Sequence, residues 1–586
     1  MKGFFKQCLV INVGDRTWDI ESIDDRDLAK TLGGKGLASR LLLQKNPAGV
    51  DPLSPDNHLI FALGPATDTL IWGNSRYGIY TRSPLTGFFG ESYAGGRAAV
   101  CMSKTGFDAF VIHGVADKPV WLEISDNGVK FHDASDLWGL DTYRTQDEVK
   151  KRLDASDVGI VVIGPAGENL VHFAVVENDY WRSAGRCGMG AVLGSKKVKA
   201  IAFYGSKKRP VADSKGIRAY ASKTLKAYKE HPAVKAYHDY GTPMMVALLN
   251  NAGGFPTRYW ASGRYEKWRN ISAEVMVDRC KVRPRACRTC FMACGKYLEV
   301  TEGRHKGLVI EGPEYETIYS FGGLCMIDSI EEIAYLNDIC DRLGLDTITA
   351  GNLAAFTIEA SRRGKIKEKF DYGDVDGVAR LLEDIAYRRK IGDILAKGIK
   401  VAASEWGLES LAVHVKGLEP AGYDPRALKG MGLAYAVSDR GACHLRSTFY
   451  KAELSGMIDP EQIEGKAELF VDFEDRCTLF DCLILCRFFR DLYPWEELTT
   501  IVELTTGQAL EKSELQTIAS NVTDQCRWFN LREGLTPEDD TLPERFFKDS
   551  LEDGKTITSD ELSRMIKEYY RLRGWDERGV PAVLSP

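Results

Sequence analysis

Three cysteines in a C-x2-C-x3-C spacing are the clearest chemical signal in the chain. Cys287, Cys290 and Cys294 lie in the run ACRTCFMACGK at 286–296. Thiolates are ligands of zinc and of iron–sulfur clusters, and such short loops let one segment wrap a single metal centre. A fourth ligand must come from elsewhere in the chain. The spacing favours an iron–sulfur cluster, with structural zinc and three unligated thiols as the alternatives.

Acid–base chemistry has candidates in two further motifs. The run EGPEYET at 311–317 places Glu311, Glu314 and Glu316 close together, and His444 lies in RGACHLR as one of only nine histidines. Neighbouring carboxylates perturb one another's pKa and suit proton transfer. An exposed acidic turn and a structural histidine are the alternatives.

Two short runs share one form. DRLGLD spans Asp341 to Asp346 and DCLILC spans Asp481 to Cys486, so each has an aspartate, three intervening residues, a leucine, and a polar or sulfur residue. Paired carboxylates can accept hydrogen bonds from the amino-pyrimidine edge of a heterocycle. Helix-capping aspartates would have the same pattern.

Composition limits the kind of protein that carries these motifs. With 586 residues and 44 % hydrophobic content, the chain can bury a large core and form two to four domains. A net charge of −6, from 77 basic and 83 acidic residues, argues against nucleic acid as the main partner. No membrane span or cleavage-site pattern opens the sequence, and fourteen cysteines are too sparse for a disulfide framework. We therefore expect a cytoplasmic protein.

The elements that position these residues differ along the chain. Residues 1–208 alternate short β-rich runs with Gly and Pro, and HLIFALGPATD at 58–68 is echoed by VGIVVIGPAGE at 158–168. This echo predicts an internal repeat with two similar sheets. Glycine-rich loops at 33–38, 94–99 and 182–196 are either turns or phosphate-binding loops. Arginines in or beside them are Arg76, Arg97, Arg182 and Arg186.

The remainder reads as helical. We expect helices near 215–231, 329–342 and 347–363, a long helix over 375–405, and an irregular connection over 407–430. A capping box of Thr558 and Glu561 opens a last helix that runs to Gly574. The predicted fold is α+β, with a β-rich base domain at 1–208 and helical domains at 209–413 and 414–586.

These motifs together resemble one known family. GPATD, SRYGIYTRSPLTGF, NDYWRSAGRCGMGAVLGSKKVKAIA, CRTCFMAC, EGPEYET, CDRLGLDTI, YDPRALKGMGLAYA, RGACH, DCLILC and LRGW are similar, in this order, to the tungsten-containing aldehyde:ferredoxin oxidoreductase family. The resemblance implies a double-sheet base for two pyranopterin cofactors that hold one tungsten or molybdenum, enclosed by two mostly helical domains. It also implies a [4Fe–4S] cluster and a Mg²⁺ ion that bridges the pterin phosphates.

The resemblance assigns roles to individual positions. Cys287, Cys290, Cys294 and Cys486 match the cluster ligands, and Glu316 and His444 match the pair beside the metal. Matched cofactor-binding positions are Arg76, Tyr93, Gly95, Arg182, Ser183, Asp341, Leu345, Asp346, Arg446, Asp481 and Leu485. Helical spacing places Cys482 on the same face as Cys486, and Cys477 about 140° round from Cys482.

The sequence also departs from the family pattern. Tyr93 and Ser183 replace asparagine and alanine near the magnesium, where backbone carbonyls do the binding. Tyr335 and Asp338 replace the E-x-x-H metal site of homodimeric members, which favours a hetero-oligomer. Cys325 replaces an apolar residue and is either a tungsten ligand or a buried free cysteine.

The leading hypothesis is oxidation of an aldehyde to a carboxylic acid, with electrons leaving to a ferredoxin or an iron–sulfur subunit. One alternative is the catalytic subunit of a low-potential reductase of aromatic acids or aryl-CoA thioesters. The other, outside enzymes, is a zinc-stapled binding protein. Tyr259, Trp260, Phe449 and Tyr450 hint at a bulky or aryl substrate.

Overall fold

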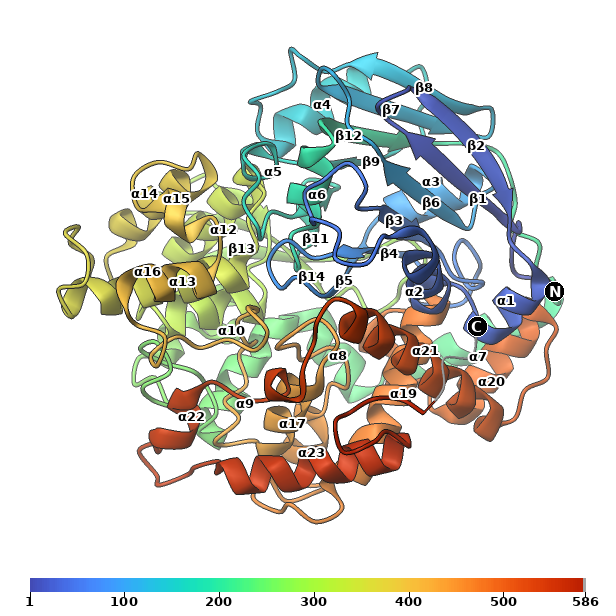
Figure 1. Cartoon of the computed structure of the whole chain (residues 1–586). Coiled ribbons are helices and arrows are strands. Elements are labelled where there is room, and N and C mark those ends of the chain that lie inside the picture. Colours follow the sequence, from blue (N-terminus) through green and yellow to red (C-terminus); the bar gives the residue numbers. More distant parts are fainter. Residues whose placement is uncertain (583–586) are drawn as a thin grey trace.

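A computed structural model describes residues 1–582 and has the predicted α+β architecture. A β-rich base forms one side of the molecule, and two groups of helices close against it (Figure 1). The predicted boundary at 208 falls between β12 and α7 (Ser214–Tyr228). The boundary at 413 falls in an irregular segment between α16 (Ile399–Trp406) and α17 (Lys429–Val437).

The base contains two six-stranded sheets of equivalent topology. The first has the order β2 (Thr17–Ser22), β1 (Gln7–Asn12), β6 (Ala109–His113), β3 (Leu59–Ala62), β4 (Arg76–Arg82), β5 (Phe89–Gly95). The second has the order β8 (Gly128–Asp133), β7 (Val120–Ser125), β12 (Val198–Phe203), β9 (Gly159–Val162), β10 (Val176–Asn178), β11 (Arg182–Ala184). In each sheet the second strand is antiparallel to the edge strand and parallel to the third. The predicted pair of similar sheets is confirmed.

The GPA turn after β3 and the GPA turn after β9 each meet a helical domain. A Cβ on Gly64 would lie 2.2 Å from the carbonyl oxygen of Leu483, and one on Gly164 would lie 2.4 Å from that of Leu343. Only glycine permits such a close approach between backbones. Each sheet therefore contacts one of the two aspartate-to-leucine runs directly.

Several helices have the predicted bounds. α12 (Ile330–Leu343) and α13 (Thr347–Arg362) flank the first aspartate-to-leucine run, and α23 (Ser559–Arg573) has the predicted capping box and ends at Gly574. The helix expected over 375–405 is wrong, because it is divided into α14 (Val375–Ala386), α15 (Gly392–Leu395) and α16. Arg388, Lys390 and Gly398 have positive φ angles there, which an α-helix cannot contain.

A small sheet within the second region was not predicted. It joins β13 (Cys280–Arg285), β14 (Gly295–Val300) and β15 (Val309–Glu311), and the cysteine motif is the loop between β13 and β14. These strands are short and rich in charged residues, so their period-two pattern is weak. Antiparallel pairing of β13 with β14 brings the two ends of the cysteine loop together.

Packing joins the three regions into one body. A single buried apolar cluster includes Phe61 from the base, Phe356 from α13 and Tyr569 from α23. A second cluster, with Leu483 and Phe489, packs against the cysteine loop through Met292. No helix within residues 1–582 has the length and hydropathy needed to span a bilayer.

Candidate active site

A cavity of about 360 Å³ lies where the base meets both helical regions. Its wall includes most of the residues selected from the sequence. They are Arg76, Tyr93, Gly95, Arg182, Ser183, Cys287, Cys290, Cys294, Glu316, Asp341, Leu345, Asp346, His444 and Cys486. The fold thus gathers residues that are far apart in the chain around one volume.

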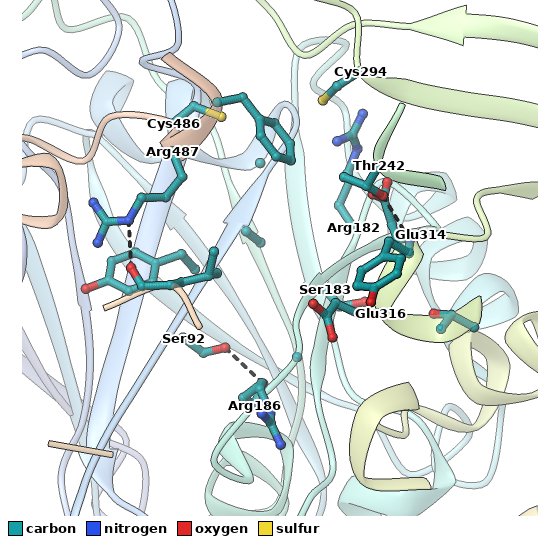
Figure 2. A pocket seen from close by; sticks show the side chains of 18 of the residues that line it. Ser92, Arg182, Ser183, Arg186, Thr242, Cys294, Glu314, Glu316, Cys486 and Arg487 are labelled. Atoms are coloured by element: carbon teal, nitrogen blue, oxygen red, sulfur yellow. Dashed lines mark hydrogen bonds between the residues drawn. The ribbon is translucent and has the colours of Figure 1, made fainter. Parts of the chain in front are cut away.

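The four predicted cluster cysteines share one part of this wall. In Figure 2 the sulfur atoms of Cys294 and Cys486 point toward each other. The Cys486 N–H donates to the carbonyl of Gly73 (2.9 Å), and the Gly73 N–H donates to that of Thr289 (3.3 Å). Gly73 therefore links the Cys486 segment to the cysteine loop.

The surroundings of the thiols fit an iron–sulfur cluster. A Cβ on Gly95 would lie only 3.0 Å from the Cys287 sulfur, so glycine leaves space for that thiol. Burial, together with the negative charges of Cys486 and Cys287, raises the pKa of Cys290 to about 12. Grouped thiolates need a compensating cation, and four cysteines are the usual ligand set of a [4Fe–4S] cluster. Within residues 1–582, no three His, Cys, Asp or Glu side chains are arranged as ligands of a single metal ion.

The alternative fourth ligands lie elsewhere. Cys477 and Cys482 are buried in α19 (Lys466–Leu483) and are not part of the cavity wall. The helix ends at Leu483, and Ile484 has a positive φ of 55°. The expectation that Cys482 and Cys486 share a helix face is therefore wrong, because Cys486 lies beyond the helix. The choice of Cys486 instead depends on this left-handed turn.

Glu316 and His444 lie side by side on the cavity wall. Glu316 lies in α11 (Tyr315–Thr317), directly before a π-helical turn at Ile318–Gly323, a feature often found at functional sites. The distance from His444 Nε2 to Glu316 Oε1 is 3.4 Å. The Gly422 N–H donates to Glu316 Oε2 (3.0 Å). Glu316 Oε1 and His444 Nδ1 have no hydrogen-bond partner among the described residues, so both can bind a ligand.

Burial sets the protonation of this pair. It raises the pKa of Glu316 to about 8. Burial and the positive charges of Arg440 and Arg186 hold the pKa of His444 well below its ordinary value. Near neutral pH the pair is therefore a carboxylic acid beside a neutral imidazole. Such displaced pKa values are typical of acid–base catalysts.

The other two glutamates of EGPEYET have different surroundings. Glu311 is buried and ion-paired with Arg182 and Arg285. Glu314 is exposed and accepts a hydrogen bond from Thr242, as Figure 2 shows. The acidic-turn alternative thus describes Glu314, whereas only Glu316 is paired with the histidine.

The aspartates of the first run lie on the wall. Asp346 caps α13 by accepting from the N–H groups of Ile348 (3.1 Å) and Thr349 (3.3 Å), and it also accepts from Arg186 Nε (3.2 Å). Asp346 is therefore a helix-capping aspartate, as the alternative predicted, and it also lines the cavity. Burial, with the nearby Glu177 carboxylate, raises the pKa of Asp341 well above its ordinary value.

The second run is placed differently. Asp481 Oδ2 accepts from Arg446 Nη1 and from Arg487 Nη2, both at 2.5 Å. Arg487 lines the cavity, whereas Asp481, Arg446 and Leu485 lie behind it. The structure does not bring these three predicted residues to the wall. The Asp481 carboxylate instead binds the guanidinium of Arg487, and Arg487 lines the cavity.

Cys325 and three of the four selected aromatics also lie off the wall. The Cys325 thiol is fully buried and donates to the carbonyl of Gly351 (3.4 Å). Tyr259, Trp260 and Phe449 are core residues, so the hint that they border the pocket is wrong. Tyr450 does line the cavity.

The base strands contribute main-chain groups. The carbonyl of Tyr93 accepts from Arg76 Nη2 (3.2 Å). The Ser183 hydroxyl donates to Glu177 Oε1 (2.6 Å), on the neighbouring strand. The Tyr93 hydroxyl donates to Glu91 Oε2 (2.6 Å), so both substituted side chains have partners within the base.

Tyr423 is a site residue that sequence reasoning missed. Its ring stacks on Tyr450 (centroids 4.1 Å apart) and on His444 (5.5 Å), and it lines the cavity. The motif YDPR at 423–426 was the available signal, but an aromatic in an irregular segment has no periodicity to reveal its role.

Comparison with known proteins gives a consistent result. Residues 8–205 match the family model described as aldehyde ferredoxin oxidoreductase, N-terminal domain, and residues 219–583 match that of its domains 2 and 3. The tungsten-containing aldehyde ferredoxin oxidoreductases of Pyrococcus furiosus and Thermococcus kodakarensis are each 35 % identical, over 99 % of this chain and 97 % of theirs. A WOR-like subunit of an aliphatic sulfonate oxidoreductase from Pyrococcus furiosus is 27 % identical over 94 % of this chain and 92 % of its own.

Among solved structures, the active-site complex BamBC of benzoyl coenzyme A reductase, bound to 1,5-dienoyl-CoA, has a similar fold. The TM-score is 0.86, with 22 % sequence identity, over 99 % of this chain and 96 % of that one.

Proposed function

The chain belongs to the aldehyde ferredoxin oxidoreductase family, and on that basis we propose that it is a tungsten enzyme that oxidises an aldehyde to a carboxylic acid, with water as the oxygen source. The observation that carries the proposal is the Glu316–His444 pair, which has unpartnered polar atoms on the same cavity wall as four cysteines. The site thus combines proton-transfer groups with ligands for a redox centre.

The cofactors proposed for this cavity are a bis-pyranopterin with tungsten or molybdenum, a [4Fe–4S] cluster and Mg²⁺. When bound, they supply the two-electron oxidation and the one-electron exit. The cluster would be held by Cys287, Cys290, Cys294 and Cys486. The pterins would be held by Arg76, Gly95, Arg182, Asp341 and Asp346. Mg²⁺ would be bound by the carbonyls of Tyr93 and Ser183.

The chain's own groups manage protons and orientation. Glu316, once ionised, can accept a proton from water or from an aldehyde hydrate through the unpartnered Oε1. His444 is neutral and keeps one N–H, which can donate to the carbonyl oxygen as negative charge develops there. The stacked rings of Tyr423 and Tyr450 fix the plane of the imidazole.

Two measurements on the anaerobically purified protein test this proposal. Elemental analysis should find tungsten or molybdenum together with about four irons per chain. A panel of aliphatic and aromatic aldehydes should reduce a viologen dye, and the corresponding acids should be tested in the reverse direction. Zinc alone, or no turnover of any aldehyde, would contradict it.

The low-potential reductase is the second candidate. Cys325 as a metal ligand would suit this candidate, but that thiol donates to the backbone carbonyls of Ser320 and Gly351 and does not line the cavity. Similarity to BamBC concerns the fold. Reduction of an aromatic acid or thioester, without oxidation of any aldehyde, would favour this candidate in the same panel.

The raised pKa of Glu316 predicts a pH profile. Below about pH 8 the carboxyl is protonated and cannot act as a base, so kcat/KM for an aldehyde should increase with pH and level off above about 8. Burial also raises the pKa of Glu419 to about 8, but this residue lies outside the cavity wall. The inflection should persist in Glu419→Gln and disappear in Glu316→Gln. An inflection that persists in Glu316→Gln and disappears in Glu419→Gln would show that Glu419, and not Glu316, is the titrating group.

Assembly is the next prediction. Tyr335 stacks on His305 (4.2 Å), and Asp338 accepts from Arg342 Nε (2.7 Å) and the Tyr143 hydroxyl (3.1 Å). Both side chains are engaged within the chain, so we expect no metal-bridged homodimer. Light scattering of the native protein should find this chain with a separate iron–sulfur subunit or carrier. A homodimer that shares one extra metal would contradict this expectation.

We place the enzyme in the cytoplasm. All fourteen cysteines are unpaired, as expected of a protein that works in a reducing compartment.

A further inference from the structure

A second groove, of about 510 Å³, opens beside the cysteine loop. It is lined by five segments: the turn before α3 (Ala98–Lys104), the helix α4 (Thr142–Lys151), the start of β9, the turn after β10, and residues 285–288 around Cys287. Cys287, Arg182 and Arg288 line both this groove and the active-site cavity. The groove therefore leads from the protein surface to one of the proposed cluster ligands.

The groove is strongly basic. Its lining has five cations, Arg97, Lys150, Arg182, Arg285 and Arg288, and one carboxylate, Asp179. This is unusual for a chain with a net charge of −6. Positive charge concentrated in a cleft of an otherwise acidic protein attracts and orients an acidic partner.

Neighbouring carboxylates cancel only part of this charge. Asp157 is shared by Arg97 (3.9 Å), Arg288 (3.5 Å) and Lys104 (2.5 Å). Glu311 is shared by Arg182 and Arg285. Lys150 is exposed and has no ion-pair partner among residues 1–582. A surplus of positive charge thus faces the solvent at the groove.

The shape suits a protein surface better than a small anion. Arg97 and Arg288 are about half exposed, at 52 % and 48 %, and they line a broad groove instead of converging on one buried point. Val158 and Ile160 also line the groove, but they are only 9 % and 7 % exposed. Arginine is enriched at protein interfaces relative to the rest of the surface.

We propose that this groove is the docking site of a small acidic electron-carrier protein. The inference rests on the proposed function, because it takes Cys287 as a ligand of the cluster. One electron would pass from the reduced cluster to the oxidised centre of the carrier, and no bond would form or break. The arginines and Lys150 would set the orientation and the encounter rate, which decreases as salt rises.

Binding can be measured independently of turnover. The holoenzyme is titrated with an oxidised, acidic plant-type [2Fe–2S] ferredoxin at low and high ionic strength. The test variant is Arg97→Glu with Lys150→Glu. The control is Arg571→Glu with Lys548→Glu, which has the same charge change on α23 and α22 (Glu544–Lys548), at the far end of the molecule from α4 (Figure 1). Arg97→Gln with Lys150→Gln is a milder variant.

The groove variant should weaken ferredoxin binding about tenfold at low salt, and the difference should shrink at high salt. The control should change binding less than twofold. Aldehyde oxidation with methyl viologen, a small dye that needs no protein surface, should be unchanged in both variants. If wild type oxidises no aldehyde but still binds ferredoxin at the groove, the proposed function fails and the docking site stands.

Two outcomes would overturn the docking site. One is equal weakening of ferredoxin binding by the groove variants and the control. The other is ferredoxin binding that stays unchanged in the groove variants, while inorganic phosphate at millimolar concentration binds the wild type and no longer binds the glutamine variant. This pair of results would identify the groove as a small-anion site.

Discussion

Cys486→Ala should cost the enzyme its iron–sulfur cluster and its electron transfer to any protein acceptor. Cys486 is the one of the three C-terminal candidates whose side chain lines the cavity opposite the cysteine loop. An iron without its fourth thiolate has an open position and is labile. Iron content, visible absorbance and the paramagnetic signal of the reduced protein measure this loss.

Two matched variants separate ligand loss from general damage. Cys477→Ala and Cys482→Ala each remove a buried thiol from α19, so they should leave the cluster whole. Each should lower the free energy of unfolding by about 1 kcal/mol or somewhat more, through a small cavity. Retention of the cluster in Cys486→Ala with its loss in Cys482→Ala would reverse the assignment.

Glu316→Gln should lower turnover about 10²–10⁴-fold, because the amide keeps the shape of the side chain but cannot accept a proton. His444→Ala should have an effect of similar size through loss of the donor to the developing oxyanion. Tungsten and iron contents should stay at wild-type values in both. Turnover is measured anaerobically with a viologen dye.

The chain offers a matched control for this pair. His305 Nε2 lies 2.8 Å from Glu332 Oε2, and neither residue lines the cavity. His305→Ala and Glu332→Gln should leave turnover within about twofold, because neither side chain reaches the cavity. Full activity in Glu316→Gln and His444→Ala with complete metal loading would remove both residues from the mechanism.

The sequence predicted most of the base, and most of the residues that it singled out lie on the cavity wall. Strands with apolar runs and Gly/Pro turns were recognisable, and the echo between 58–68 and 158–168 predicted two similar sheets. The cysteine spacing and the resemblance together predicted residues that the fold brings to one cavity. These features depend on local pattern and on motif identity, which a single sequence contains.

Other features depend on tertiary contacts between segments that are far apart in the sequence. The Asp481 carboxylate lies behind the wall because Arg446 and Arg487 hold it there, and nothing in DCLILC indicates those partners. The break of the 375–405 helix at Arg388 and Lys390 involves residues with good helix propensity, so tertiary packing overrides the local preference. The basic groove gathers residues from five separate segments and has no sequence motif.

The contacts of the two GPA turns with Leu483 and Leu343 bear on where electrons would leave the protein. Leu345 N–H donates to Cys340 O and Leu485 N–H donates to Phe480 O, so both runs end their helices in the same way above equivalent sheets. At the third position after each helix the duplicated halves differ. One half has Asp346, which caps a helix, and the other has Cys486, which faces three more thiols. Under the proposed function, electrons would therefore leave from only one half of a scaffold whose two sheets have the same topology.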